Sequence, residues 1–280
     1  MPELPEVETV KRGVSPLLEG RRLVRVVQRR DSLRIPLPAR FVERLTGRTV
    51  ARITRRAKYL LLHLDGAEIL ICHLGMSGKM TLVAAADRKS PEIFEKHDHV
   101  ILESDRHDLV IYNDPRRFGL MTLCDAAALD RHPLFCGMGP EPLGNQFHGA
   151  YLFDKISRRR APVKNVLLDQ RVVVGLGNIY VCEALFEAGI SPTAPACDLS
   201  RDKVEKLASV IRDVLRRAIE AGGSTLKDYA RIDGELGYFQ HQFRVYGRAG
   251  ESCATPGCGR RIERIVQSGR STFYCPACQD

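Results

Sequence analysis

The first residues whose types and spacing suggest chemistry lie at the start of the chain, where Met1 is followed by Pro2 and Glu3. Removal of Met1 leaves the Pro2 nitrogen as a free secondary amine. An α-amino group has an ordinary pKa of about 8 and a lysine side chain one of about 10.4, so at neutral pH the unprotonated fraction is more than ~100-fold larger for Pro2 than for an unperturbed Lys58. Pro2 is therefore a candidate nucleophile, although Pro2 and Pro5 also fit the simpler interpretation of a helix start.

A secondary amine of this kind can add to an electrophilic carbon such as C1′ of a nucleotide sugar. The product is an iminium that has no N–H proton to lose, and it therefore remains an electron sink that can drive elimination. Glu3 is adjacent to Pro2 and Glu6 lies three residues further on, which places both carboxylates on one helix face. A carboxyl group in this position is suited to proton transfer at the sugar ring.

Four of the nine cysteines are clustered late in the chain, in the pattern C-x4-C, sixteen intervening residues and C-x2-C: Cys253, Cys258, Cys275 and Cys278. Two close pairs joined by a hairpin can present four thiolates to a tetrahedral Zn(II), and four protein ligands leave no position for a reactive water. We therefore expect one structural Zn(II); the alternatives are free thiols or two disulfides. The other five cysteines have apolar neighbours and are expected to be buried: Cys72, Cys124, Cys136, Cys182 and Cys197.

Basic residues are concentrated in two places. The formal net charge of the whole chain is +9. Residues 1–60 contain 15 Lys and Arg against 6 Asp and Glu, whereas the rest of the chain is balanced. The segment 244–280 has 37 residues, fewer than the ~40 at which an apolar core usually suffices, so zinc should stabilise it. Four of its six arginines are expected to be either solvated or in contact with phosphates: Arg260, Arg261, Arg264 and Arg270. Both concentrations favour a polyanionic partner.

The hydrophobic pattern predicts an α+β protein with several domains. Apolar residues recur at helical spacing from Leu4 to Val14, so a helix begins almost at the first residue. Short β-rich runs with tight turns then favour an antiparallel β-sandwich, with a hairpin turn at Asp65-Gly66. The runs are RLVRVV, TVARI, YLLLHL, AEILICHL, HVILES, DLVIYN and GLMTL.

Helical periodicity returns beyond about residue 150. A short helix is expected over 162–169, and a second over 178–188 with Gly189 as its end. Ser200 is the expected N-cap of a longer helix that ends at Gly222. The chain has no apolar run of the ~18 to 20 residues that a membrane span needs, and its acidic start is unlike a signal peptide, so we expect a cytoplasmic protein.

Six motifs together resemble formamidopyrimidine-DNA glycosylases, in order along the chain: MPELPEVE at 1–8, HLGMSG at 73–78, NDPRRFG at 113–119, GLGNIY at 175–180, YGR at 246–248 and GRSTFYCPAC at 269–278. The resemblance implies a base-excision-repair enzyme that removes oxidised purines, such as 8-oxoguanine and ring-opened purines, from double-stranded DNA and nicks the abasic site by β,δ-elimination. It also implies a monomer. One departure is the first cysteine pair, spaced C-x4-C where the family commonly has C-x2-C, which leaves the local loop shape open but not the four ligands.

Site roles follow from the same resemblance. Pro2 is expected to be the Schiff-base nucleophile, Glu3 the proton donor and Lys58 a second acid/base group, while Arg270 contacts a phosphate at the lesion. Further DNA contacts are expected from Met76, His97, Arg116, Arg117, Phe118, Lys164 and Asn178. Of these, Met76, Arg116 and Phe118 form a wedge that enters the base stack. Residues 234–240 resemble a loop that closes over the flipped base.

The implied domains are a catalytic β-sandwich with a leading helix over 1–135, a helix-two-turns-helix domain over 150–240 and a zinc-finger hairpin over 244–280. Two other interpretations are open. A related enzyme of the endonuclease VIII type would act on oxidised pyrimidines, although PELPEVE rather than a PEGPE-type start argues against it. A non-catalytic zinc-containing DNA-binding protein would share the basic residues but have no use for a free Pro2.

Overall fold

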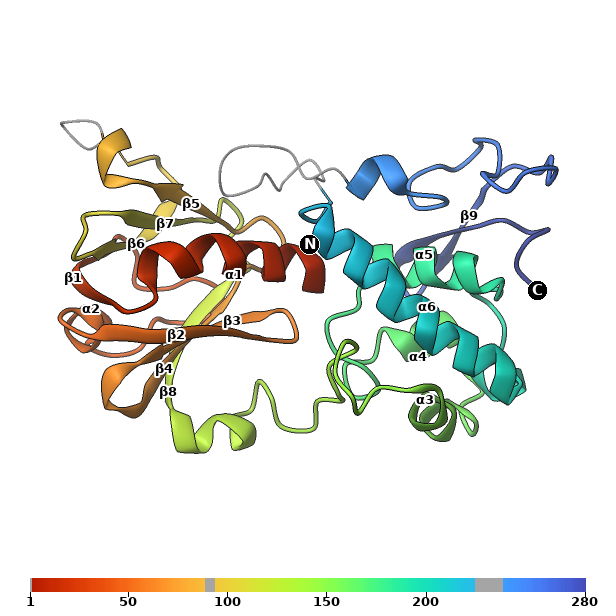
Figure 1. The fold of residues 1–280 in the computed structure, drawn as a ribbon, viewed down its shortest axis with the longest axis horizontal. Coiled ribbons are helices and arrows are strands. Elements are labelled where there is room, and N and C mark those ends of the chain that lie inside the picture. Colours follow the sequence, from red (N-terminus) through yellow and green to blue (C-terminus); the bar gives the residue numbers. More distant parts are fainter. Residues whose placement is uncertain (1, 89–93, 225–238) are drawn as a thin grey trace. The chain divides into compact units, whose positions relative to one another are not determined.

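The computed structural model describes residues 2–88, 94–224 and 239–280, which divide into two compact units (Figure 1). The first unit comprises Met1–Cys136 and Gly222–Tyr238, and the second comprises Gly137–Ala221 and Phe239–Asp280. The helical segment and the cysteine-rich segment therefore belong to one compact unit.

The first unit is an antiparallel sheet that folds into two layers. Its strands lie in the order β5-β7-β6-β1-β2-β3-β4-β8, and β1 joins the layers because its first two residues pair with β2 and the rest with β6. The strands are β1 (Arg21–Gln28), β2 (Thr49–Arg56), β3 (Tyr59–Leu64), β4 (Glu68–His73), β5 (Lys79–Val83), β6 (Asp98–Ser104), β7 (Leu109–Asn113) and β8 (Leu120–Asp125). A short helix, α2 (Phe41–Leu45), follows β1. This arrangement confirms the predicted antiparallel sandwich.

Helix α1 (Leu4–Leu18) lies along the sheet, in red in Figure 1. It begins where the sequence predicts, with Pro5 in its first turn and a capping box between Glu3 and Glu6. Its buried apolar residues join side chains from both layers in one core, and they include Val7, Val10, Val14 and Leu18. Because each fully buried Val or Leu contributes about 1.5–3 kcal/mol, this face fixes the helix against the sheet.

All seven predicted β-rich runs form strands, and the Asp65-Gly66 turn joins β3 to β4 through a 3-10 turn over Asp65–Ala67. Strand β5 was not predicted. It is a five-residue edge strand that begins with Lys79 and is mostly half-buried, so its apolar pattern is too short to stand out. Other 3-10 turns lie at Ala85–Asp87 and Ala126–Arg131.

The second unit contains four helices and a two-stranded hairpin: α3 (Gly149–Ile156), α4 (Val163–Leu167), α5 (Asn178–Ala188), α6 (Arg201–Glu220), β9 (Glu263–Gln267) and β10 (Arg270–Tyr274). Short 3-10 turns lie at Ala196–Asp198 and Phe239–Gln242. Helix α5 ends at Gly189 in the left-handed region, and the Ser200 side chain caps α6 by accepting from the Lys203 N–H at 3.3 Å. These ends agree with the prediction.

The prediction that all five isolated cysteines are buried was wrong for two of them. Cys136 is exposed and Cys197 is half-buried, because Cys136 lies in a turn and Cys197 in the short 3-10 turn Ala196–Asp198, outside the strands and α-helices of the core. Within the described ranges, no helix combines the length and the apolar character needed to cross a bilayer.

Candidate functional site

The start of α1 buries two carboxylates next to Pro2. Pro2 is buried, and Glu3 and Glu6 are each only 2% exposed. The Glu3 N–H donates to Glu6 Oε2 at 2.8 Å, while both the N–H and the hydroxyl of Ser224 donate to Glu6 Oε1 at 2.9 and 3.0 Å. Glu6 therefore fixes the Glu3 backbone, and Glu3 lies at a helix N-terminus, where the dipole favours negative charge. This anchoring role of Glu6 was not predicted from the sequence.

Lys58 lies in the tight turn between β2 and β3, where Ala57 has φ 54°. Lys58 is buried, and only 8% of its surface is exposed. The first residue of β3, Tyr59, pairs with His73, the last residue of β4, so the turn and His73 share one end of the sheet. Burial, together with the charges of Lys58 and Arg34, lowers the pKa of His73 to about 4. The His73 ring is therefore neutral near pH 7, and its Nδ1 accepts the Gly75 N–H at 3.0 Å.

Two loops, one between β4 and β5 and one between β7 and β8, carry the predicted wedge. Met76 and Phe118 are 40% and 43% exposed, which is unusual for large apolar side chains, and the Arg116 guanidinium lies over the Phe118 ring at 4.5 Å. The loops pack backbone against backbone: a Cβ on Gly75 would lie 2.3 Å from the Phe118 carbonyl carbon. Only glycine fits there, so the structure brings the three predicted wedge residues together on two loops in direct contact.

A buried carboxylate joins these loops. Asp114 is fully buried and accepts from the Ser77 hydroxyl at 2.6 Å, the Tyr112 hydroxyl at 3.0 Å and the Gly119 N–H at 2.8 Å. We call Asp114, Ser77, Tyr112 and Gly119 the wedge hub. Burial and the Asp114 charge raise the pKa of Tyr112, which keeps its hydroxyl protonated as a donor.

The wedge hub was not predicted from the sequence, although Asp114 stands in the NDPRRFG motif. An aspartate before a proline is a turn signal, and this was the available clue. His97, a predicted DNA contact, lies close by, since its carbonyl accepts the Asp114 N–H at 3.0 Å. Arg116 and Arg117 are both exposed, and Arg117 has φ 55°, in the left-handed region.

The four clustered cysteines in the second unit fit Zn(II). Their Sγ atoms all lie within 4.8 Å of one another, with separations of 3.8 Å for Cys253 and Cys278, 3.6 Å for Cys258 and Cys275, and 3.4 Å for Cys258 and Cys278. A tetrahedral site with Zn–S bonds of about 2.3 Å requires sulfur separations of about 3.8 Å. The longer C-x4-C loop turns outside the cluster, with Gly257 at φ 76°. The four residues form one structural zinc site.

The hairpin is tied to two helices of its own unit through one carbonyl group. Asn178 Nδ2, at the start of α5, donates to the Ser271 carbonyl at 2.8 Å, and Lys164 Nζ donates to it at 3.4 Å and to the Thr272 hydroxyl at 2.6 Å. These contacts hold the residue next to Arg270, which is exposed. Lys164 is fully buried, so in this conformation its ammonium group stabilises the hairpin, and its DNA contact stays a prediction.

Another buried carboxylate whose role was not predicted from the sequence anchors the start of the cysteine-rich segment. Glu183 of α5 accepts the N–H groups of Arg244, Val245 and Tyr246 at 2.8, 3.0 and 2.8 Å. Burial raises the pKa of Glu183, whereas these three hydrogen bonds lower it. The predicted loop over 234–240 lies largely outside the described residues.

A helix-led antiparallel sandwich in one unit, with helices and a zinc hairpin in the other, defines the zinc-finger class of DNA glycosylases. Three family models match the chain: the formamidopyrimidine-DNA glycosylase N-terminal domain over residues 1–121, its H2TH domain over 138–230 and the zinc finger found in FPG and IleRS over 250–280. The chain belongs to the formamidopyrimidine-DNA glycosylase family.

Individual relatives agree with this assignment over their full lengths. The chain is 53% identical to the formamidopyrimidine-DNA glycosylase of Dinoroseobacter shibae and 55% identical to that of Phenylobacterium zucineum, with 100% of each chain covered. A Lactococcus lactis Fpg complex with DNA containing an abasic site has TM-score 0.89 and 34% identity over 99% of each chain. The MutM (FPG) protein of Thermus thermophilus has TM-score 0.86 and 40% identity, covering 99% of this chain and 98% of the other.

Proposed function

We propose that this protein excises oxidised purines such as 8-oxoguanine and formamidopyrimidines from double-stranded DNA, with Pro2 as the nucleophile, and then nicks the resulting abasic site. The observation that carries the proposal is the match over the full chain to relatives named for this activity, at 53–55% identity. Solved Lactococcus lactis Fpg structures contain DNA with an abasic site or with Fapy-dG, which supports damaged DNA as the partner.

The chemistry requires that Met1 has been removed. The lone pair of the Pro2 nitrogen then forms a bond to C1′ of the damaged nucleotide, and the electron pair of the glycosidic bond leaves with the base, which takes up the proton that the nitrogen loses. Glu3 donates a proton to the sugar ring oxygen, so the ring opens and the bond from Pro2 to C1′ becomes an iminium. The buried capping box supports this role because it holds the Glu3 backbone next to Pro2.

Strand nicking follows from the same iminium. It accepts electrons when a proton leaves C2′ and the 3′ phosphate departs, and a second elimination releases the 5′ phosphate. We assign the proton transfers other than the one to the sugar ring oxygen to Lys58. This residue lies in a turn at the same end of the sheet as the neutral His73. Hydrolysis of the remaining Schiff base returns the free Pro2 amine.

The other predicted residues bind DNA in this proposal. Met76, Arg116 and Phe118 fill the space that the flipped base leaves, which offsets the cost of unstacking. Asn178 at the N-terminus of α5 and Arg270 on the hairpin contact phosphates next to the lesion. We further propose that the functional division is 1–135, 150–240 and 244–280, and that the protein acts as a monomer in the cytoplasm, associated with nucleoid DNA.

Borohydride trapping tests the proposal. The enzyme, with Met1 removal checked by intact mass, is incubated with duplexes that contain 8-oxoguanine or thymine glycol, and the covalent adduct is mapped by peptide mass spectrometry. We expect an adduct on Pro2 with the 8-oxoguanine duplex. A form whose N-terminal amine is blocked should give none, whereas Lys58→Gln, which leaves the amine intact, should still be trapped.

Each alternative has its own outcome in this experiment. An adduct that persists undiminished with a blocked amine, or that maps to Lys58 alone, contradicts Pro2 as the nucleophile. Preferential trapping on thymine glycol indicates an enzyme of the endonuclease VIII type. Binding to both duplexes without any adduct indicates a non-catalytic DNA-binding protein.

A further inference from the structure

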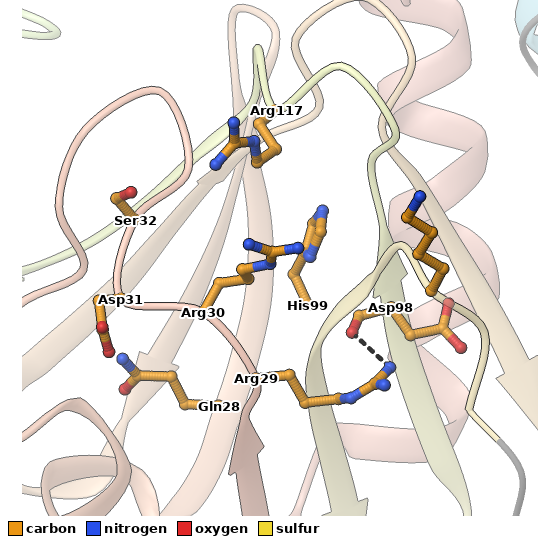
Figure 2. Close-up of a pocket in the computed structure, with 9 residues that line it drawn as sticks. Gln28, Arg29, Arg30, Asp31, Ser32, Asp98, His99 and Arg117 are labelled. Atoms are coloured by element: carbon orange, nitrogen blue, oxygen red, sulfur yellow. Dashed lines mark hydrogen bonds between the residues drawn. The ribbon is translucent and has the colours of Figure 1, made fainter.

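A polar pocket in the first unit lies outside the residues assigned above to the chemistry. It has a volume of about 530 Å³ and is lined by residues 28–32, at the end of β1 and just beyond it, by Lys96, Asp98 and His99, and by Arg117 (Figure 2). Its lining includes four cationic side chains and two carboxylates. The pocket therefore has an excess of positive charge that solvent or a ligand must balance.

His99 gives the pocket an unsatisfied polar atom. The residue is 1% exposed, and its Nε2 lies 2.8 Å from the Asp114 carbonyl oxygen, which can only accept. Nε2 must therefore carry a proton, and the buried Nδ1 has no hydrogen-bond partner among the described residues. Buried polar atoms of this kind are uncommon unless a ligand or water completes them. With Nε2 protonated, Nδ1 is an acceptor, so a water held in the pocket would complete it.

Two of the cations are available to a ligand. Arg30 and Arg117 are exposed, and neither side chain forms a hydrogen bond or ion pair with the rest of the described chain. Figure 2 shows the Arg30 side chain turned toward the His99 ring, while Asp31 lies beside Gln28. Two guanidinium groups that line one pocket without an ion-pair partner among the described residues repel each other, and a phosphate group would remove that repulsion.

Two other charged groups of the lining, Arg29 and Asp98, are already engaged. Arg29 Nη1 donates to the carbonyl groups of Glu95 and Asp98 at 2.6 and 2.9 Å. Asp98 accepts the Glu95 N–H with one carboxylate oxygen, at 2.7 Å, and the Asn113 side chain with the other, at 2.8 Å. The Asp98 charge is thus held by donors of its own, so it does not neutralise Arg30 or Arg117.

The pocket is also connected to the wedge loops. Arg117 follows Arg116 directly, and its left-handed backbone, with φ 55°, lets the two side chains take different directions: Arg116 lies over Phe118, whereas Arg117 lines the pocket. His99 bonds to the carbonyl group of Asp114, whose carboxylate organises the wedge hub. His99, which lines the pocket, is therefore one hydrogen bond from the hub.

From these contacts we propose that Arg30 and Arg117, which line the pocket with His99, bind one phosphate group, and that its source is the backbone of the DNA strand that passes the wedge. Phosphate contacts fix the position of a protein on the duplex without reading sequence, so this site would fix the wedge loops relative to the DNA. The choice of DNA as the source rests on the proposed function, whereas the anion chemistry of the pocket does not.

Salt dependence of DNA binding tests the site. Affinity for an undamaged duplex is measured at several salt concentrations for the wild type, Arg30→Gln, Arg117→Gln and the double variant. Loss of one phosphate contact lowers the magnitude of the slope of log K against log salt by about 0.9. Because the two arginines share one phosphate, we expect the double variant to lose about 0.9 and each single variant no more than that.

Arg106→Gln is the matched control. Arg106 is exposed in the same unit, in the turn after β6, whereas His99 lies near the start of that strand, and the substitution removes the same charge. A slope change in the double variant no larger than that in Arg106→Gln overturns the site. A loss of about 1.8 means two separate phosphates and overturns the shared site.

A second measurement changes the DNA, so that the wild-type protein itself can be tested. Neutral methylphosphonate replaces each DNA phosphate in turn, and we expect one position where the replacement weakens binding by the wild type but not by the double variant. The absence of such a position overturns DNA as the source. Inorganic phosphate is the other arm: if it raises the melting temperature of the wild type only, while the salt slopes are equal, the pocket takes free phosphate and the DNA assignment is wrong. Borohydride trapping, which depends on Pro2, reports separately on the proposed function.

Discussion

The wedge hub of the first unit and the zinc hairpin of the second both hold exposed side chains that we assign to DNA, yet they are stabilised differently. The hub lies against a large apolar core to which α1 and both layers of the sheet contribute, and its carboxylate has three hydrogen-bond donors. The hairpin packs on a cluster of five buried residues, one of which is the zinc ligand Cys275. A short hairpin has too little apolar surface to offset its chain entropy, so a metal takes the place of a core.

Buried polar groups have different roles in the hub and in the hairpin. In the hub, a buried charge is tolerated because each of its neighbours donates to it, and removal of the charge would leave those donors unpaired. In the hairpin, the sulfur atoms are brought together for a ligand that supplies most of the binding energy itself. Disruption of the hub should therefore damage one network, whereas loss of the metal should unfold a whole segment.

Zinc removal should have the largest effect. Structural zinc contributes about 10–16 kcal/mol in small finger peptides, so Cys258→Ser or chelation should unfold the hairpin while the sheet of the first unit stays folded. Hydrogen exchange should show loss of protection in β9 and β10 and full protection in β3 and β4. Cys136→Ser, at an exposed cysteine outside the cluster, is the control and should retain the metal. A hairpin that stays protected without zinc would show that its apolar packing suffices.

Asp114→Ala should come next. The substitution leaves the donors of Ser77, Tyr112 and Gly119 without their acceptor, and each buried unpaired donor costs about 1–3 kcal/mol. We expect the free energy of unfolding of the first unit to fall by about 3–5 kcal/mol in urea denaturation. Asp108→Ala, at a half-buried carboxylate whose side chain accepts the Ala85 N–H at 3.0 Å, is the control and should cost much less. Equal losses in the two variants would mean that the hub has no special role.

His73 should give the smallest effect, and only in acid. Its pKa in the folded protein is about 4, below the ordinary value of 6.5, so the unfolded chain takes up a proton first as the pH falls. The stabilisation that comes from the neutral His73 ring is complete above pH 6.5. As the pH falls toward 4 it is lost, and the free energy of unfolding falls by up to about 3 kcal/mol. His73→Asn keeps an acceptor for the Gly75 N–H but does not titrate. Denaturation between pH 7 and 4 should therefore show a shallower fall in this variant, and parallel curves would contradict the prediction.

Local patterns predicted most of the architecture because they depend on near neighbours in the chain. The period of α1, the caps at Ser200 and Gly189 and the seven strand runs follow from propensity and turn chemistry. Strand β5 was not predicted because its five residues at a sheet edge are too few to show a clear alternation of apolar and polar side chains. The exposure of Cys136 was also missed, since an apolar neighbourhood in the sequence does not fix a residue's place in an irregular segment.

The sequence by itself determined which groups are available: a proline after Met1, the spacing of four cysteines and two arginines in one turn. Only the tertiary structure decided which groups meet. Ser77 and Asp114 are 37 residues apart, and Ser224 and Glu6 are 218 apart. Such pairs depend on how the strands and helices pack, because hydrogen-bond partners so distant in the chain leave no periodic signal. The same packing leaves His99 Nδ1 unpaired beside Arg30 and Arg117, a feature that residue types alone could not reveal.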